Sequence, residues 1–314
     1  MAKVLTPRDS ISASFMKKAQ SKGRRTLTNQ RSKTTFNAFE RIAKQGRWRD
    51  TAGKPVTPAT VTQNQLRQFV GTRIDEGLNP RTIQTDMGNI RRALHAAGRN
   101  DFADKICTNA VLGVPKGNRR GYGLVVDLEV YKAALEKADP DTRAMIEIQR
   151  MFGLRQKEMT DCAPSLRNWE RDLREGRATI TIDRSTKGDK TRYCFVPPEK
   201  REEALRIVLA MKEVCERNGG RVVVADGLKE ACKEAGIMYA KVGLMGDNSS
   251  HSLRRAFCEE RVQWYMNDGY SLRQAWGKTS IDVGHSDKRA RWLYNNYLRG
   301  TIEAANDAQA REAA

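Results

Sequence analysis

Apolar residues in the first third of this chain recur at the spacing of α-helices. The stretch 79–98 is the clearest case, because Asn79 can cap a helix and Gly98 can end it. Its apolar positions follow steps of four, three and four, at Ile83, Met87, Ile90 and Leu94. Similar spacing predicts helices over about 26–45 and 60–77, followed by a short one over 101–109. These four segments predict a compact all-α unit.

The rest of the chain shows helical spacing again, interrupted by one stretch of alternating residues. Ile180 and Ile182 alternate with polar residues, and Tyr193 and Phe195 alternate on the way back. The intervening turn, Gly188-Asp189, completes the pattern of a β-hairpin. Helices are predicted over about 127–138, 142–152 and 199–217, from about 250 onward, and after about 289. The pattern therefore predicts a mainly α protein with a small antiparallel β-hairpin.

The clearest boundary lies at 113–123, where the sequence reads GVPKGNRRGYG. Four glycines, one proline and three basic residues fit an exposed linker. The predicted organisation is a basic N-terminal tail or arm at 1–24, a helical unit at 25–115, a linker at 116–123, a second unit at 124–300 and a C-terminal tail at 301–314. The charged stretch 161–175 is interpreted as an insertion before the hairpin.

The net positive charge of the chain indicates which class of partner it binds. The chain has 57 Lys and Arg against 38 Asp and Glu, a formal net charge of +19. Such an excess favours a polyanion, and nucleic acid is favoured over a membrane because no apolar run is long enough to span a bilayer. The N-terminus lacks a hydrophobic signal core, so we expect a cytoplasmic protein.

Cysteine usage gives no sign of a metal centre. The six cysteines are scattered without a CxxC pair, and the three histidines do not cluster. The expectation is free thiols and neither a zinc site nor a disulfide framework.

Three basic boxes are candidates for an anion site. Arg155 and Glu158 share a helical face, which is an ordinary surface pair unless the carboxylate holds the guanidinium in a phosphate site. Lys187 lies at the predicted hairpin tip, where most lysines only add solubility. His251 and Arg254 project from the first turns of a predicted helix that Ser249 or Ser250 can cap, together with Arg255. A helix N-terminus with this polar face favours a phosphate.

A fourth box lies near the chain's end, at 283–300. The pair Gly284-His285 precedes a short predicted helix that carries Tyr294, with Tyr297 one turn further on. A tyrosine there is either an aromatic packed by its ring or a covalent nucleophile. A phenol with a pKa of about 10 needs nearby cations to attack near neutral pH, so the other boxes decide between these readings.

Taken in order, these boxes resemble the tyrosine recombinase or phage integrase family. The motifs are GLRQKE (153–158), TKGDK (186–190), HSLR (251–254), GH (284–285), and Tyr294 nine residues after His285. The helical unit, above all GLNPRTIQTDMGNIRRALHAAG, resembles the family's core-binding domain, so the likeness covers about 25–300. The family implies a two-domain DNA clamp, with an all-α SAM-like core-binding domain and an α+β tyrosine-recombinase catalytic domain.

The resemblance also implies residue roles. Tyr294 would attack the scissile phosphorus and form a 3′-phosphotyrosyl link. Arg155 and Arg254 would bind the non-bridging oxygens, and Glu158 would support Arg155. The other catalytic groups would be the histidines His251 and His285, and Lys187 as the acid for the 5′-oxygen. No metal and no cofactor would be required, because cationic side chains would stabilise the charge.

DNA contacts and partners follow from the same resemblance and from the basic charge. The candidate DNA-binding residues are Arg81, Arg91, Arg92, Arg119, Arg120 and Arg255. The expected partners are double-stranded DNA attachment sites, other copies of the chain in a tetramer on DNA, and host DNA-bending or directionality factors. The host element would be a phage or another mobile element, and the C-terminal tail would either dock on a neighbouring protomer or fray.

Some positions depart from the family pattern or have competitors. Arg255 stands where many members carry a second histidine. Lys190 competes with Lys187, and Tyr297 competes with Tyr294. Two alternative functions are a type IB topoisomerase-like enzyme, which would relax supercoils, and a non-catalytic DNA-binding protein on the same scaffold. The integrase-like helical unit argues against the first and the complete set of boxes against the second.

Overall fold

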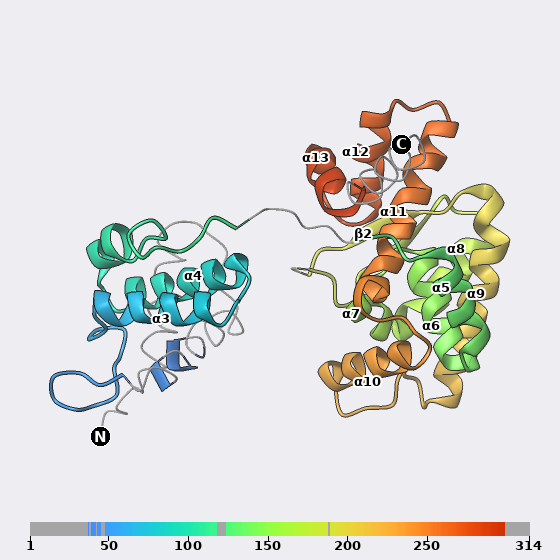
Figure 1. Ribbon diagram of the computed structural model, residues 1–314. Helices are drawn as coiled ribbons and strands as arrows, with labels where there is room; N and C mark the ends of the chain where they lie inside the picture. Colours follow the sequence, from blue (N-terminus) through green and yellow to red (C-terminus); the bar gives the residue numbers. More distant parts are fainter. Residues whose placement is uncertain are drawn as a thin grey trace, which may run out of the picture. The chain divides into compact units, whose positions relative to one another are not determined.

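The computed structural model describes residues 37, 39–41, 43–44, 48–117, 124–187 and 189–298. The chain forms two compact units, Met1–Arg119 and Arg120–Ala314 (Figure 1). The predicted tails at 1–24 and 301–314, most of the predicted linker, most of the first predicted helix and Gly188 lie outside the described residues. Arg119 and Arg120 lie outside them as well.

The first unit is helical. The elements that are described over their whole length are helix α3 (Gln63–Asp75), helix α4 (Pro80–Ala96) and a π-helical turn (Phe102–Ile106). The prediction for α4 is confirmed: the Asn79 side chain accepts from the Arg81 amide at 2.9 Å, and the four apolar positions expected to face inward are buried. They pack with Leu66, Phe69 and Val70 of α3 in one core.

Helix α3 begins later than predicted, at Gln63 instead of Thr60. The physical reason is a capping box in which the Gln65 amide donates to Thr62 Oγ1 at 3.3 Å and the Thr62 amide donates to Gln65 Oε1 at 2.9 Å. The Thr60 hydroxyl instead accepts from the Thr57 amide in the preceding turn.

The second unit is a bundle of helices with one hairpin (Figure 1). Helix α6 packs against α9, α10 and α11, and α12 packs against both α11 and strand β2. Its elements in order are α5 (Leu128–Lys137), α6 (Pro140–Met151), α7 (Gln156–Thr160), α8 (Leu166–Arg174), β1 (Thr179–Ile182), β2 (Arg192–Phe195), α9 (Arg201–Arg217), α10 (Leu228–Lys241), α11 (Ser250–Asn267), α12 (Leu272–Asp282), α13 (Ala290–Leu293) and a π-helical turn (Tyr294–Leu298). Short 3₁₀ turns connect several of them.

The hairpin is antiparallel as predicted, and Arg192 and Cys194 are the buried positions of its return strand. Strand β1 pairs with β2 so that Ile180 faces Cys194 and Ile182 faces Arg192. Cross-strand partners point to the same side, so the buried isoleucines require Arg192 and Cys194 to point inward. Tyr193 is 58% exposed.

Two helices of this unit had weak or no sequence signals. The charged stretch taken as an insertion contains α8, whose Trp169 is buried and donates from Nε1 to the Thr181 carbonyl at 2.6 Å. Helix α8 therefore contributes to the core although the stretch 161–175 is highly charged. Helix α10 was not predicted, because its buried face is made mainly of small residues, Ala231 and Ala235, with Tyr239.

Other sequence expectations concern the whole chain. All six cysteines are unbridged, and five of them are buried. None of the helices among the described residues combines the length and the apolar character needed to cross a membrane. Within the same residues, no three His, Cys, Asp or Glu side chains gather where they could hold a metal ion.

Candidate active site

The candidate site of the second unit is built around the carboxylate of Glu158. This side chain is fully buried in α7, and three arginines surround it: Arg155 Nη1 at 2.5 Å, Arg192 Nη2 at 2.9 Å and Arg254 Nη1 at 3.6 Å. Burial raises the pKa of Glu158, but the three guanidiniums, with Arg192 the strongest, outweigh it and lower that pKa to about 2. The carboxylate is therefore ionised and fixes the positive groups around it.

Arg155 lies at the N-terminus of α7, directly after the chain reverses at Gly153. Its amide and its Nη1 both donate to the carboxylate of Glu158, so the Glu158 side chain caps the N-terminus of its own helix. About a quarter of the guanidinium side chain, 23%, remains exposed. Arg155 thus presents part of its fork outward while Glu158 holds the rest.

Arg254 is completely buried, which the sequence did not predict. It was expected on the polar face of α11, yet its exposed fraction is 0%. Its donors go to the Gly153 carbonyl, to the Val283 carbonyl at 2.6 Å and, from Nε, to the Tyr297 hydroxyl at 3.3 Å. Burial opposes its charge, but Tyr297 and Glu158 raise the pKa of Arg254 above its ordinary value. The side chain therefore stays cationic inside the protein.

Both predicted histidines lie beside these arginines. Desolvation, followed by the charges of Arg255 and Arg254, lowers the pKa of His251 to about 4. Desolvation and the charges of Arg155 and Arg254 lower the pKa of His285 to about 4 as well. Each imidazole is therefore neutral at pH 7 and able both to donate and to accept a hydrogen bond.

Lys187 reaches the same group of charges from the hairpin. It is exposed, as is its competitor Lys190. The positive charge of Lys187 contributes to the lowered pKa of His285, after the contributions of Arg155, Arg254 and Arg289. The structure therefore brings residues from α7, the hairpin, α11 and the segment after α12 to one electropositive place.

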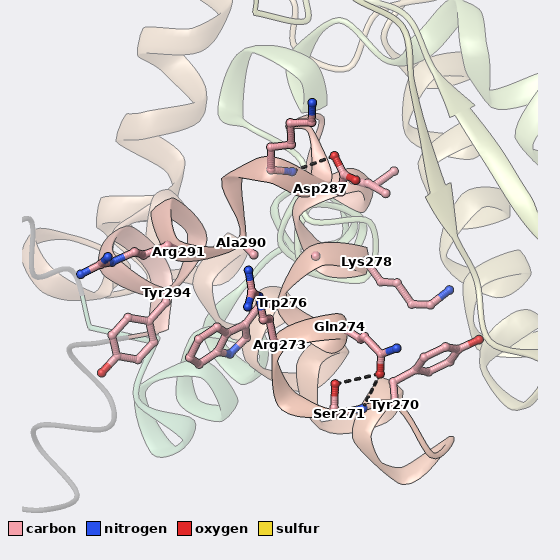
Figure 2. A pocket seen from close by; sticks show the side chains of 13 residues that line it. Tyr270, Ser271, Arg273, Gln274, Trp276, Lys278, Asp287, Ala290, Arg291 and Tyr294 are labelled. Atoms are coloured by element: carbon pink, nitrogen blue, oxygen red, sulfur yellow. Dashed lines mark hydrogen bonds between the residues drawn. The ribbon is translucent and has the colours of Figure 1, made fainter.

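The two tyrosines of the last turn lie in different surroundings. The Tyr297 ring is buried, 5.5 Å from the His251 ring, and the Tyr297 phenol interacts with the charges of Arg155, Arg254 and Arg255. The Tyr294 ring lies on the Trp276 ring, 4.8 Å between centroids, and lines an open cavity of about 1170 Å³ beside α12 (Figure 2). The structure thus brings Tyr297, and not Tyr294, to the arginine cluster.

The candidate DNA-contacting arginines differ in their exposure and in their hydrogen-bond partners within the protein. In the first unit Arg81 is exposed, whereas Arg91 donates to the Cys107 carbonyl at 2.9 Å and to Asn109 Oδ1 at 3.0 Å. Arg92 donates to Asn89 Oδ1 at 2.6 Å. In the second unit Arg255 is half-buried beside Tyr297 and donates to the Leu124 carbonyl at 3.4 Å. Arg91 and Arg255 thus also connect separate segments of their own units.

One residue of the site was missed from the sequence. Arg192 is 4% exposed and bonds Glu158 from the first position of β2. A signal was available: Ile182 and Arg192 are cross-strand neighbours in any hairpin with this register, so an inward isoleucine implies an inward arginine.

Comparison with known proteins gives the site its context. The sequence model of the family described as Integrase matches residues 118–260. This range includes Arg155, Glu158, Lys187, His251 and Arg254 and ends before His285. No curated protein sequence matches the chain.

Solved structures share the fold. The Tn1549 transposon integrase in complex with transposon right end DNA is 16% identical over 97% of this chain and 99% of that chain, with a TM-score of 0.56. Lambda integrase bound to DNA is 16% identical over 92% and 96% of the two chains, with a TM-score of 0.54. A lambda integrase dimer bound to a COC′ core site is 15% identical over 91% and 77%, with a TM-score of 0.53. Residues 118–260 of the chain therefore match the Integrase family model, and the chain shares its fold with the Tn1549 and lambda integrases.

Proposed function

We propose that this chain is a tyrosine-type site-specific DNA recombinase, which cleaves and rejoins double-stranded DNA at the cluster formed by Arg155, Arg254, His251, His285 and Lys187. The observation that carries the proposal is the gathering of Arg155 and Arg254 around one ionised, buried carboxylate, Glu158, with the imidazoles of His251 and His285 beside these arginines. A phosphodiester is the DNA group that matches such a site, since its non-bridging oxygens gain charge as phosphorus is attacked.

In the proposed reaction the Tyr294 phenol oxygen forms a bond to phosphorus while the bond from phosphorus to the 5′-oxygen breaks. A neutral imidazole, His251 or His285, accepts the phenol proton, and Lys187 gives a proton to the departing 5′-oxygen. The product is a 3′-phosphotyrosyl link and a 5′-hydroxyl. Attack by the 5′-hydroxyl of another strand reverses the step, so the joined strands need no external energy source.

This assignment of Tyr294 requires the segment after α12 to rearrange on DNA. In the present structure the Tyr294 ring stacks on Trp276, and the Tyr297 hydroxyl accepts from Arg254. The spacing of nine residues from His285 supports Tyr294 as the nucleophile. The cationic surroundings of Tyr297 support Tyr297 instead. Substituting each tyrosine separately distinguishes the two, as set out in the Discussion.

Exchange between two DNA duplexes requires one nucleophile for each of four strands, so we propose that a tetramer of this chain assembles on paired attachment sites. The net charge of +19 supports an electrostatic contribution to DNA binding. The lambda integrase dimer on its core site is a DNA-bound assembly in a protein of the same fold.

A selection on DNA tests the proposal. The full chain is incubated with a pool of nicked duplexes of randomised sequence in EDTA, and adducts that resist denaturation are captured and sequenced. We expect covalent adducts through a 3′-phosphate of the strand on the 5′ side of the nick, because the short fragment with the 5′-hydroxyl is released. We also expect enrichment of one site, followed by strand exchange between two copies of it. Failure of the chain to form an adduct with any duplex contradicts the proposal. Adducts and supercoil relaxation without strand exchange would favour the topoisomerase alternative.

A further inference from the structure

Arg192 lies at the point where the separate parts of the candidate site meet. From β2 its guanidinium donates to Glu158 Oε2 at 2.9 Å, to the Asp282 carbonyl at 2.5 Å and to the Gly153 carbonyl at 3.3 Å. We propose that Arg192 is a positioning residue of the recombinase, which holds Arg155, Arg254 and His285 in one arrangement without touching DNA itself. This inference rests on the proposed function.

The first connection runs through Glu158. Oε1 of this carboxylate bonds the Arg155 guanidinium, and Oε2 accepts from both the Arg155 amide and Arg192. Arg192 is the strongest of the charges that lower the pKa of Glu158. Removing Arg192 would leave a buried carboxylate with one strong partner fewer, and its proton affinity would rise. A protonated Glu158 would hold Arg155 less firmly.

The second connection runs through the carbonyl of Gly153. This oxygen accepts from Arg192 and also from Nη1 of Arg254. Two buried guanidiniums are thus tied to the same backbone atom, two residues before Arg155. A displacement of Arg192 would move the acceptor on which Arg254 depends.

The third connection reaches the segment that carries His285. Nη1 of Arg192 bonds the Asp282 carbonyl, and the Asp282 carboxylate is itself bonded by the Phe195 amide at 3.3 Å and the Tyr265 hydroxyl at 3.0 Å. Gly284 follows with a φ of +78°, and a Cβ there would come within 2.9 Å of Arg192 Cδ. The backbone before His285 therefore lies directly on the Arg192 side chain.

The burial of Arg192 argues against a role in direct contact with DNA. Its side chain is 3% exposed, so it does not reach a phosphate at the surface. The Arg192 guanidinium has four acceptors, because the Phe152 carbonyl at 3.4 Å adds to those of Gly153, Asp282 and Glu158. Its planar fork therefore fixes several oxygens of separate segments at once. Lysine keeps the charge but presents a single nitrogen, so it separates the contribution of charge from the contribution of geometry.

The test uses the DNA site selected by the wild-type chain. Single-turnover cleavage, DNA affinity and thermal unfolding are measured for Arg192→Gln and Arg192→Lys, from pH 8 down to the lowest pH at which the wild-type chain stays folded, so that the acid limb falls within the range. The matched control is Arg150→Gln, which removes another guanidinium bonded to a carboxylate, that of Glu260, in the same unit. We expect Arg192→Gln to lower the cleavage rate about 100-fold with nearly unchanged DNA affinity, as is typical of small misplacements of catalytic groups.

The pH profile distinguishes positioning from general stability. In Arg192→Gln the acid limb of cleavage should shift to higher pH, because Glu158 takes up a proton more readily, whereas Arg192→Lys should keep the limb and lose about 10-fold in rate. Arg150→Gln should leave the acid limb of cleavage in place.

Two results would overturn the inference. One is equal cleavage in wild type and either folded Arg192 variant, and the other is an acid limb that does not move in a folded Arg192→Gln protein. If Arg192→Gln does not fold, Arg192→Lys decides alone. Absence of adducts with the wild-type chain contradicts the proposed function instead.

Discussion

Tyr294 and Tyr297 lie three residues apart in the same π-helical turn, but their rings enter different surroundings. Tyr297 is buried beside His251, with its hydroxyl 3.3 Å from Arg254 Nε. Tyr294 is partly exposed on Trp276, at a cavity whose rim includes Arg273 and Arg291 (Figure 2). One turn of helix therefore directs one phenol into the arginine cluster and the other onto an aromatic surface.

The difference shows that family spacing and local surroundings are separate criteria for a nucleophile. Spacing from His285 selects Tyr294, whereas the physical requirement for nearby cations is met by Tyr297 in the structure without DNA. The two criteria agree only if DNA binding moves the turn so that the Tyr297 hydroxyl leaves Arg254 and the Tyr294 hydroxyl approaches it. Four predictions test this comparison, beginning with the largest effect.

Replacing the nucleophile should remove the covalent adduct. We expect Tyr294→Phe to reduce adduct formation on the selected nicked site by about 10⁴-fold or more, because no other oxygen replaces the attacking phenol. Tyr297→Phe should remain within about 100-fold of wild type, since it loses one hydrogen bond, that from the cationic Arg254. Adducts are measured on denaturing gels. The reverse pattern would assign the nucleophile to Tyr297.

The two surroundings also predict different roles for their arginines. Arg254→Lys should lower single-turnover cleavage by about 10²- to 10³-fold, because lysine does not reproduce the three bonds to Gly153, Val283 and Tyr297. Arg291→Ala, at the cavity beside Tyr294, is the matched control and should change cleavage by less than about 10-fold. A larger loss in Arg291→Ala than in Arg254→Lys would reverse the comparison.

Stacking on Trp276 should restrain Tyr294. If the turn must open before cleavage, Trp276→Ala should speed adduct formation by about 2- to 10-fold, the equivalent of one aromatic pair. Trp276→Phe retains an aromatic partner and should behave as wild type. Slower cleavage in a folded Trp276→Ala protein would mean that the stack supports the reactive conformation.

The histidines near the arginine cluster should remain neutral in mildly acidic solution. Their pKa values of about 4 predict that the ring NMR signals of His251 and His285 titrate with midpoints near pH 4. Between pH 6.5 and 4 the unfolded chain binds more protons at these sites than the folded chain. The free energy of unfolding of wild type should therefore fall, relative to His285→Gln, as pH decreases through this range. A midpoint near pH 6.5 for His285 would contradict the close approach of Arg155 and Arg254.

Much of the architecture could be predicted from the chain because its elements carry strong local signals. Asn79, Pro80 and a regular apolar stripe predict α4, and the isoleucines of β1 predict the hairpin. Helix α10 could not be found in this way, since alanines at its buried positions give little contrast with the rest of the helix.

Resemblance pointed to the candidate site residues other than Arg192, but it did not give their burial. Periodicity assigns arginine to solvent, and Arg192 and Arg254 are exceptions because Glu158 and backbone carbonyls, distant in sequence, satisfy their donors. Likewise, residue spacing does not give the direction of the Tyr294 and Tyr297 side chains. That direction depends on how the turn packs on α11 and α12.

Gly153 joins the apolar interior to the electrostatics of the site. Its φ is +55°, and a methyl group in its place would lie 2.8 Å from Cγ of Phe257, while its carbonyl serves both Arg192 and Arg254. The position of a phenylalanine ring in α11 therefore limits where two charges can lie. A substitution that repacks the interior at Phe257 would therefore move the Gly153 carbonyl and the two guanidiniums bonded to it. Such a change would alter the reactivity of the site as well as the stability of the fold.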